Sequence, residues 1–230
     1  IGRASYFGAD MNPDAYGTTS DFTLVGGAQY TFNYRAGLPA ELTTGVEYNY
    51  NSPNDEQKKI AQELCDMGID VIVGGHPHVV QPMALLTSTT DPEHKTVCLY
   101  SMGNAVSNQL QGNLKAISTA HTEDGVMFSV TFNRYSDGTV ILSDAECLPT
   151  WVNLHRNNGG NEYNMIPLHI EEKDQWQETF GFNDEAMRKA GASYDRTMKI
   201  VGEGLTQIQD FLSQEKADRE QYYLDLAGQS

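Results

Sequence analysis

The apolar positions in the first half of the chain change from a helical to an extended period. Ile60 and Leu64 fall on one face of a helix. The segment Ser52-Pro53-Asn54-Asp55 predicts the start of this helix, with the serine as N-cap and the proline at the first helical position. Gly68 is typical of a helix end. The apolar run at 69–73 then predicts a short buried strand, so a helix leads directly into a strand.

Other apolar runs predict further strands. They lie at 22–25, 29–32, 96–100, 126–135 and 139–142, and the first two form either one strand or a pair broken at Gly26-Gly27. Ser136-Asp137-Gly138 separates the last two runs and is a strong signal for an antiparallel hairpin. Because helix–strand alternation precedes a hairpin, the pattern predicts an α/β sandwich rather than a purely parallel sheet.

The C-terminal part of the chain follows a different pattern. From Asn183 onward, apolar residues recur every three or four positions: Met187, Ala190, Tyr194, Met198, Val201, Leu205, Ile208 and Leu212. This stripe predicts an amphipathic helix, which we expect Gly202 and Gly204 to interrupt or weaken. The helix is expected to pack on its own domain, and the alternative is a partner-binding or dimerising helix.

These patterns divide the chain into three parts. We expect an irregular N-terminal segment at 1–20, a core domain at 21–172 and a helical extension at 173–230. The sequence contains no apolar run of membrane-spanning length and no signal-peptide pattern. It starts at Ile1 rather than methionine, so we expect a processed or trimmed N-terminus.

The net charge of the chain limits the classes of molecule that it can bind. The net charge is −16, with 31 acidic and 15 basic residues. This excess argues against nucleic acid or an anionic membrane as a partner. A polyanionic substrate would need a local cation, either a metal ion or an arginine. Three cysteines (Cys65, Cys98 and Cys147) are widely spaced and are expected to be buried small residues.

The strongest chemical signal follows the strand at 69–73. Gly74-Gly75 leads into His76-Pro77-His78, which presents two imidazoles one residue apart. On extended backbone, residues at i and i+2 project to the same side. Imidazole is the commonest metal ligand in proteins, and α/β folds place their sites at strand ends. The segment therefore predicts a metal or catalytic site, and the alternative is a pair of histidines that hold a tight loop.

Three segments together resemble a known family. They are Glu47-Tyr48 followed by residues 53–57, the stretch 68–82 around His76-Pro77-His78, and Tyr100-Ser101-Met102-Gly103-Asn104. They are similar to segments of the CapA family, bacterial poly-gamma-glutamate capsule-synthesis proteins related to calcineurin-like metallophosphatases. The likeness covers roughly residues 22–170.

The resemblance implies a fold, a metal ion and a cellular location. The fold would be a layered α/β/β/α sandwich of metallophosphatase type, incomplete at the N-terminus and with a C-terminal helical appendage. A divalent metal ion (Mn, Fe or Zn) would lie at the strand ends. The protein would be extracellular or at the cell surface, anchored to a membrane only through a segment absent from this chain.

The chain also departs from the family pattern. Thr43-Thr44-Gly45 stands where the family has His-Trp-Gly, and a threonine hydroxyl is a poor ligand for a transition metal. The family's N-terminal Gly-Asp strand end and Asn-His ligand pair have no counterpart in residues 1–40.

Five residues make up the candidate metal and catalytic site. His76 and His78 are the predicted metal ligands, and His78 and Glu47 are the predicted catalytic groups. Asn104 and Gly75 are expected to contact substrate or to support the ligands. Glu47 is equally well explained as a surface acid, and Asn104 as an ordinary turn residue.

Two functions remain open at this point. The first is a metal-dependent hydrolase that acts on a phosphoester or an anionic envelope polymer such as poly-gamma-glutamate. The second is a non-catalytic capsule-assembly protein that keeps the fold and has lost part of the metal site. Its partners would then be the polymer, other capsule-synthesis proteins or, through the C-terminal helix, a second copy.

Overall fold

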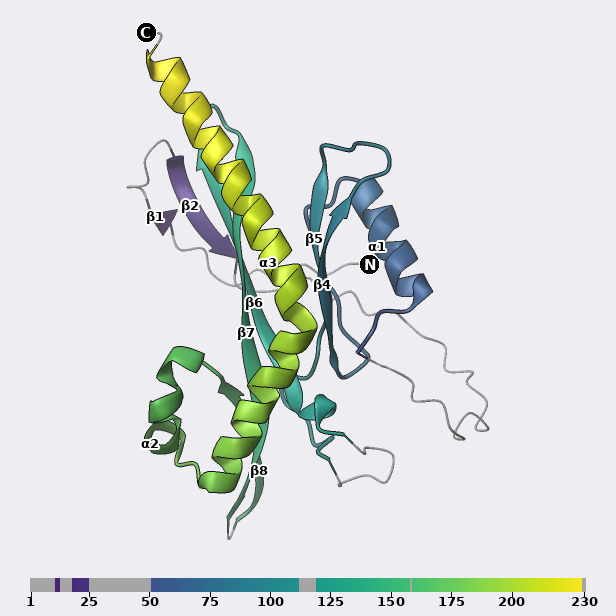
Figure 1. Ribbon diagram of the computed structural model, residues 1–230, viewed down its shortest axis with the longest axis vertical. Helices are drawn as coiled ribbons and strands as arrows, with labels where there is room; N and C mark the ends of the chain where they lie inside the picture. Colours follow the sequence, from purple (N-terminus) through teal and green to yellow (C-terminus); the bar gives the residue numbers. More distant parts are fainter. Residues whose placement is uncertain (1–10, 13–17, 25–50, 112–118, 158, 229–230) are drawn as a thin grey trace.

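The computed structural model describes residues 11–12, 18–24, 51–111, 119–157 and 159–228. Within them, helices accompany a five-stranded and a three-stranded sheet (Figure 1). The chain is therefore a mixed α/β protein with two sheets, in agreement with the predicted sandwich. None of the described helices is both long enough and apolar enough to cross a bilayer.

The larger sheet is antiparallel throughout, in the order β1-β2-β6-β7-β8. Its strands are β1 (Met11–Asn12), β2 (Thr18–Leu24), β6 (Asp124–Tyr135), β7 (Val140–Asn157) and β8 (Gly160–Pro167). The β6–β7 hairpin turns where the sequence predicts it, and Gly138 there has a φ of 89°. Residues 1–20 were expected to be irregular, but β1 and the start of β2 are strands because they pair with β2 and β6. The strand expected at 29–32 lies outside the described residues.

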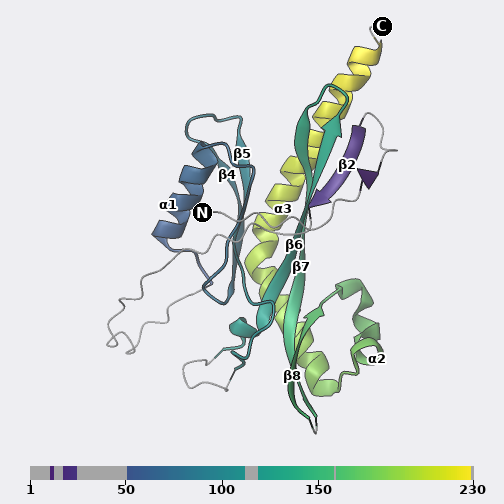
Figure 2. The ribbon, with the colours of Figure 1, turned by 180° about the vertical axis from the view of Figure 1, so that it is seen from behind.

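The smaller sheet carries the histidine segment. Its order is β3 (Val71–Val73), β5 (Lys95–Met102) and β4 (Val80–Thr87). β3 runs parallel to β5, whereas β4 is antiparallel to it. Helix α1 (Asp55–Asp66) packs against β4 and β5 (Figure 2). The predicted order of a helix, a strand and then the histidines is therefore confirmed.

The start of α1 differs from the prediction. The N-cap is Asn54 rather than Ser52. The Asn54 side chain accepts from the Gln57 N–H at 2.8 Å, and the Gln57 side chain accepts from the Asn54 N–H at 2.9 Å. This reciprocal pair forms a capping box, which satisfies two N–H groups where a serine cap would satisfy one. Pro53 therefore precedes the helix instead of occupying its first turn.

The main core lies where both sheets meet the long helix α3 (Asp184–Gly228). Its buried members are Val80, Met83, Val97, Leu99, Val126, Val130, Ala145, Val201, Leu205, Ile208 and Leu212. The last four belong to the predicted apolar stripe. The helix packs against β4 and β7, so the expectation that it packs on its own domain is confirmed.

Gly202 and Gly204 do not interrupt α3, contrary to the prediction. A Cβ at position 204 would lie 2.0 Å from the backbone oxygen of Met83 on β4. Gly204 is therefore required by the close approach of helix and strand, and the surrounding core stabilises the helix despite the low helical propensity of glycine.

A smaller cluster lies beside the start of α3. It contains residues from β7, β8, α2 (Trp176–Phe180) and α3, or from the loops between them. The 3-10 turn η2 (Ile170–Gln175) leads into α2. Its buried members are Trp151, Ile166, Leu168, Trp176, Phe182 and Ala190. The strand β8 and this cluster were not predicted from the sequence.

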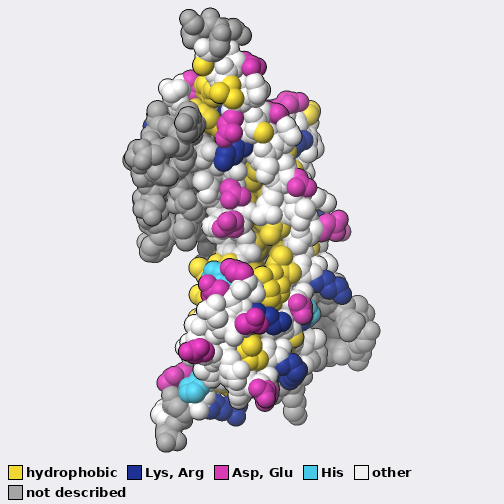
Figure 3. All heavy atoms as spheres, turned by 60° about the vertical axis from the view of Figure 1, so that its left-hand side comes forward, with side chains coloured by type: hydrophobic (Ala, Val, Ile, Leu, Met, Phe, Trp, Pro, Cys, Tyr) yellow, Lys and Arg dark blue, Asp and Glu magenta, His cyan; other side chains and the backbone are white. Residues whose placement is uncertain are grey.

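Beyond the core, the surface reflects the negative charge of the chain. Acidic side chains are spread over the face shown in Figure 3, and apolar side chains gather towards the C-terminal end of α3. Tyr222, Leu224 and Leu226 are each more than half exposed there. Self-association through this helix stays a prediction, which light scattering on the purified chain would test.

Candidate metal centre

The strand β3 continues one residue past Val73 in its pairing with β5. The Gly74 N–H donates to the Leu99 oxygen at 2.8 Å, and the Met102 N–H donates to the Gly74 oxygen at 3.1 Å. A Cβ at Gly74 would lie 2.1 Å from the Tyr100 oxygen, so only glycine allows this approach. The ends of β3 and β5 therefore lie side by side, and His76 and His78 follow directly.

The histidine loop is not extended, which corrects the geometry expected from i and i+2 positions. His76 has a φ of 100° and His78 a φ of 61°. Left-handed backbone is costly for residues with a Cβ, about 1–3 kcal/mol each, and such residues cluster at functional sites. Both side chains are exposed, with ring centroids 6.4 Å apart and planes inclined by 42°.

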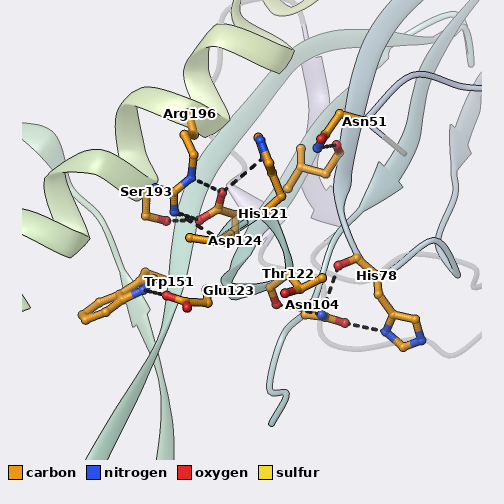
Figure 4. A network of polar contacts seen from close by, with 12 residues as sticks. Asn51, His78, Asn104, His121, Thr122, Glu123, Asp124, Trp151, Ser193 and Arg196 are labelled. Atoms are coloured by element: carbon orange, nitrogen blue, oxygen red, sulfur yellow. Dashed lines mark hydrogen bonds and ion pairs between the residues drawn. The ribbon is translucent and has the colours of Figure 1, made fainter. Parts of the chain in front are cut away.

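Asn104 is buried two residues after the end of β5, and its side chain contacts both the imidazole ring and the backbone oxygen of His78. Its Oδ1 lies 2.9 Å from the His78 Nδ1, and its Nδ2 donates to the His78 oxygen at 3.1 Å. The same Nδ2 donates to the Thr122 oxygen at 2.9 Å (Figure 4). The structure therefore brings together the predicted residues His78 and Asn104.

The other predicted site residues are placed differently. Gly75 has open space where a Cβ would lie, so no close backbone approach requires a glycine there. Glu47 and Thr43 lie outside the described residues. Among the residues that are described, no group of three or more His, Cys, Asp or Glu side chains is arranged to hold a metal ion.

The donor set fits part of a metal site. Zinc and similar ions commonly take three or four protein ligands, and imidazole nitrogen suits them. Ligating histidines usually donate the second ring N–H to an oxygen, as His78 can do towards Asn104. His76 and His78 would be the residues that hold such an ion.

A second polar cluster is centred on Asp124, the first residue of β6. Asp124, with its side chain 1 % exposed, accepts from Ser193 at 2.6 Å and from two nitrogens of Arg196 at 2.9 and 2.7 Å. These contacts join the first residue of β6 to α3 (Figure 4). Burial raises the pKa of Asp124, and the Arg196 guanidinium and the Ser193 hydroxyl oppose this shift.

The residues flanking Asp124 complete this cluster. Burial lowers the pKa of His121, whose Nδ1 lies 4.0 Å from the Asp124 carboxylate. Glu123 accepts from the Trp151 Nε1 at 3.1 Å and from the Gln111 N–H at 2.9 Å. The short 3-10 turn η1 (His121–Glu123) is thus fixed on several sides. Sequence reasoning missed this cluster, because no local motif marks it.

A cleft of about 570 Å³ lies between β7 and the start of α3. Its lining includes Trp151, Arg156, Phe182 and Lys189, and neither imidazole of the histidine loop. Its volume falls within the range of small-molecule sites. The described histidine loop is instead an exposed feature at the end of the smaller sheet.

A two-sheet α/β fold with paired imidazoles at a strand end is the arrangement expected of a metallophosphatase-type protein. Residues 40–109 match the family described as bacterial capsule synthesis protein PGA_cap. This segment, which contains His76, His78 and Asn104, is therefore similar to the CapA family.

Two curated relatives match parts of the chain to different extents. The PGA biosynthesis protein CapA of Bacillus subtilis (strain 168) is 43% identical over 65 residues, which is 28% of this chain and 15% of that protein. The capsule biosynthesis protein CapA of Bacillus anthracis is 33% identical over 98 residues, or 43% and 20% of the two chains. The matched region thus spans about a fifth or less of each relative.

Proposed function

We propose that this chain acts in the biosynthesis of a bacterial capsule, with poly-gamma-glutamate or a related anionic polymer as the substance handled. The support is the CapA-family segment at 40–109 and the names of the two relatives. Capsule polymers lie outside the cell, so the proposed location is the cell surface.

The proposed site is the histidine loop, with His76 and His78 as ligands of Mn, Fe or Zn. The observation that carries this proposal is the contact between the His78 Nδ1 and Asn104, which leaves the second nitrogen of an exposed imidazole available. A divalent ion there would polarise a phosphoryl or acyl oxygen and activate a water molecule.

Charge supports the same proposal. A chain of net charge −16 repels a polyanion at long range, so binding a polyglutamate chain or a phosphoester needs a local positive centre. A metal ion at exposed imidazoles supplies that centre. Alternatively, where His78 does not ligate the ion, its imidazole would donate a proton to the leaving group. Glu47 is the proposed second catalytic group.

A second candidate is a capsule-assembly protein without catalysis. It is favoured by the ligand count, because the described residues bring no third His, Cys, Asp or Glu to the two imidazoles. Binding of the polymer or of other capsule-synthesis proteins would then be the whole function.

Hydrolysis assays separate these candidates. The purified chain is incubated with Mn²⁺ or Zn²⁺ and p-nitrophenyl phosphate or poly-gamma-glutamate, beside the variants His78→Ala and His155→Ala. Metal-dependent hydrolysis that His78→Ala abolishes and His155→Ala preserves supports the hydrolase. Polymer binding without hydrolysis of either compound supports the assembly protein.

A further inference from the structure

We infer that Asn104 is a positioning residue that holds the His78 imidazole in its Nδ1–H tautomer and so makes Nε2 the ligating atom. This inference rests on the proposed role of the histidine loop and deepens it. It names the atom that receives the ion or the proton, and the group that selects this atom.

The orientation of the Asn104 amide is set by its hydrogen-bond partners. Its Nδ2 donates to two backbone carbonyl oxygens, those of His78 and Thr122. Carbonyl oxygens only accept, so the flipped amide would place Oδ1 against two acceptors. The amide therefore has one orientation that satisfies it, with Oδ1 directed at the His78 ring.

The amide orientation in turn selects the tautomer of His78. Because Oδ1 can only accept, the 2.9 Å contact requires a proton on the His78 Nδ1. In a neutral imidazole the lone pair then resides on Nε2. This second nitrogen points away from Asn104 (Figure 4), on a side chain that is exposed. Hydrogen bonds to the second ring nitrogen orient metal-binding histidines in the same way.

The backbone around this contact is also held. The Asn104 amide binds the ring and the carbonyl oxygen of His78 at once, which stabilises the left-handed backbone of that residue. Asn104 itself is 8% exposed, and its N–H donates to the Asp124 oxygen at 3.2 Å. Gly103 precedes it with a φ of 72°, and a Cβ there would lie 2.5 Å from the same oxygen. These contacts fix Asn104 at the junction of the two sheets.

The direct test is the tautomer of His78 in the metal-free full chain. Histidine labelled with ¹⁵N is followed by long-range ¹H–¹⁵N correlation at about pH 8.5, above the ordinary histidine pKa of about 6.5. We expect a protonated Nδ1 and an unprotonated Nε2 for His78. A His78 that carries its proton on Nε2 overturns the inference, whatever the variants show.

Variants then assign the effect to Asn104. In Asn104→Ala the acceptor is lost, so the His78 signals should move towards the Nε2–H tautomer. In Asn104→Asp an acceptor remains, so the Nδ1–H signals should persist although two donors to backbone carbonyls are lost. Asn133→Ala is the matched control: Asn133 is another buried asparagine, 7% exposed, whose Oδ1 accepts from Ser143 at 2.9 Å. Unchanged His78 signals in Asn104→Ala, or changed signals in Asn133→Ala, contradict the inference.

Metal titration keeps this inference separate from the proposed function. Calorimetric titration with Zn²⁺ should show about 10- to 100-fold weaker binding in Asn104→Ala than in the wild-type chain. No Zn²⁺ binding to the wild-type chain would refute the proposed metal site, while the tautomer spectra would still decide the role of Asn104. Equal Zn²⁺ affinity in wild type and Asn104→Ala would refute the role of Asn104 and leave the metal site intact.

Discussion

Gly204 of α3 lies directly against the backbone oxygen of Met83 in β4, so that a Cβ on residue 204 would come within 2.0 Å of this atom. Of Gly191, Gly202 and Gly204 in α3, only Gly204 has an atom of the smaller sheet close to its Cβ position. The neighbouring Gly202 has only the Met198 methyl near its Cβ position, at 3.8 Å. The two glycines therefore make a matched pair for mutation.

We predict that Gly204→Ala destabilises the chain by about 1–3 kcal/mol, because helix and strand must move apart. Gly202→Ala should stabilise it by about 0.5–1 kcal/mol, because alanine favours the helix and meets no backbone. Urea unfolding followed by circular dichroism measures both. Equal effects of the two substitutions would show that the approach to Met83 is not a constraint.

Asp124 is predicted to be a major link between β6 and α3. Asp124→Ala leaves the partly buried Arg196 guanidinium, whose side chain is 26% exposed, without its partner. The free energy of unfolding should therefore fall by about 3 kcal/mol, the lower end of the range for buried ion pairs. Lys189→Met is the control, since Lys189 and Glu185 form an exposed pair at 2.9 Å that should contribute less than about 1 kcal/mol. A loss below about 1 kcal/mol for Asp124→Ala would contradict this role.

We predict that Asp66 makes the stability of the folded chain depend on pH in the acidic range. Hydrogen bonds from the Thr89 hydroxyl and N–H, at 2.6 and 2.7 Å, hold the pKa of Asp66 at about 2, against an ordinary value of 3.8. A carboxyl whose pKa is lowered by folding stabilises the native state above its ordinary pKa. This contribution should disappear as the pH falls from 3.8 to about 2.

Melting temperatures measured over this pH range test the Asp66 prediction. Asp66→Asn should flatten the dependence of the melting temperature on pH, and Thr89→Val should flatten it in part. Wild type and Asp66→Asn with parallel curves would show that the carboxylate does not drive the effect.

The sequence predicts those features that depend on neighbouring residues. The amphipathic stripe from Met187 to Leu212 predicts α3, and Ser136-Asp137-Gly138 predicts the β6–β7 hairpin, because both signals lie within one element. The position of His76 and His78 after a strand follows from the apolar run before them in the same way.

Features that depend on distant pairings could not be predicted. Asp124 lies 69 residues from Ser193 and 72 from Arg196, and no spacing rule links them. The left-handed backbone of His78 is held by Asn104, 26 residues away, so local preferences do not specify it. The continuity of α3 through Gly204 depends likewise on packing against β4.

The most direct test of the account is the metal content of the folded chain. Wild type, His76→Ala, His78→Ala and the control His155→Ala are dialysed against Mn²⁺, Fe²⁺ or Zn²⁺ and analysed by mass spectrometry of the elements, with circular dichroism to confirm folding. We predict a stoichiometric metal ion in wild type and His155→Ala, and its loss in both loop variants. A wild-type chain without metal, or loop variants that retain it in full, would contradict a metal centre at His76 and His78.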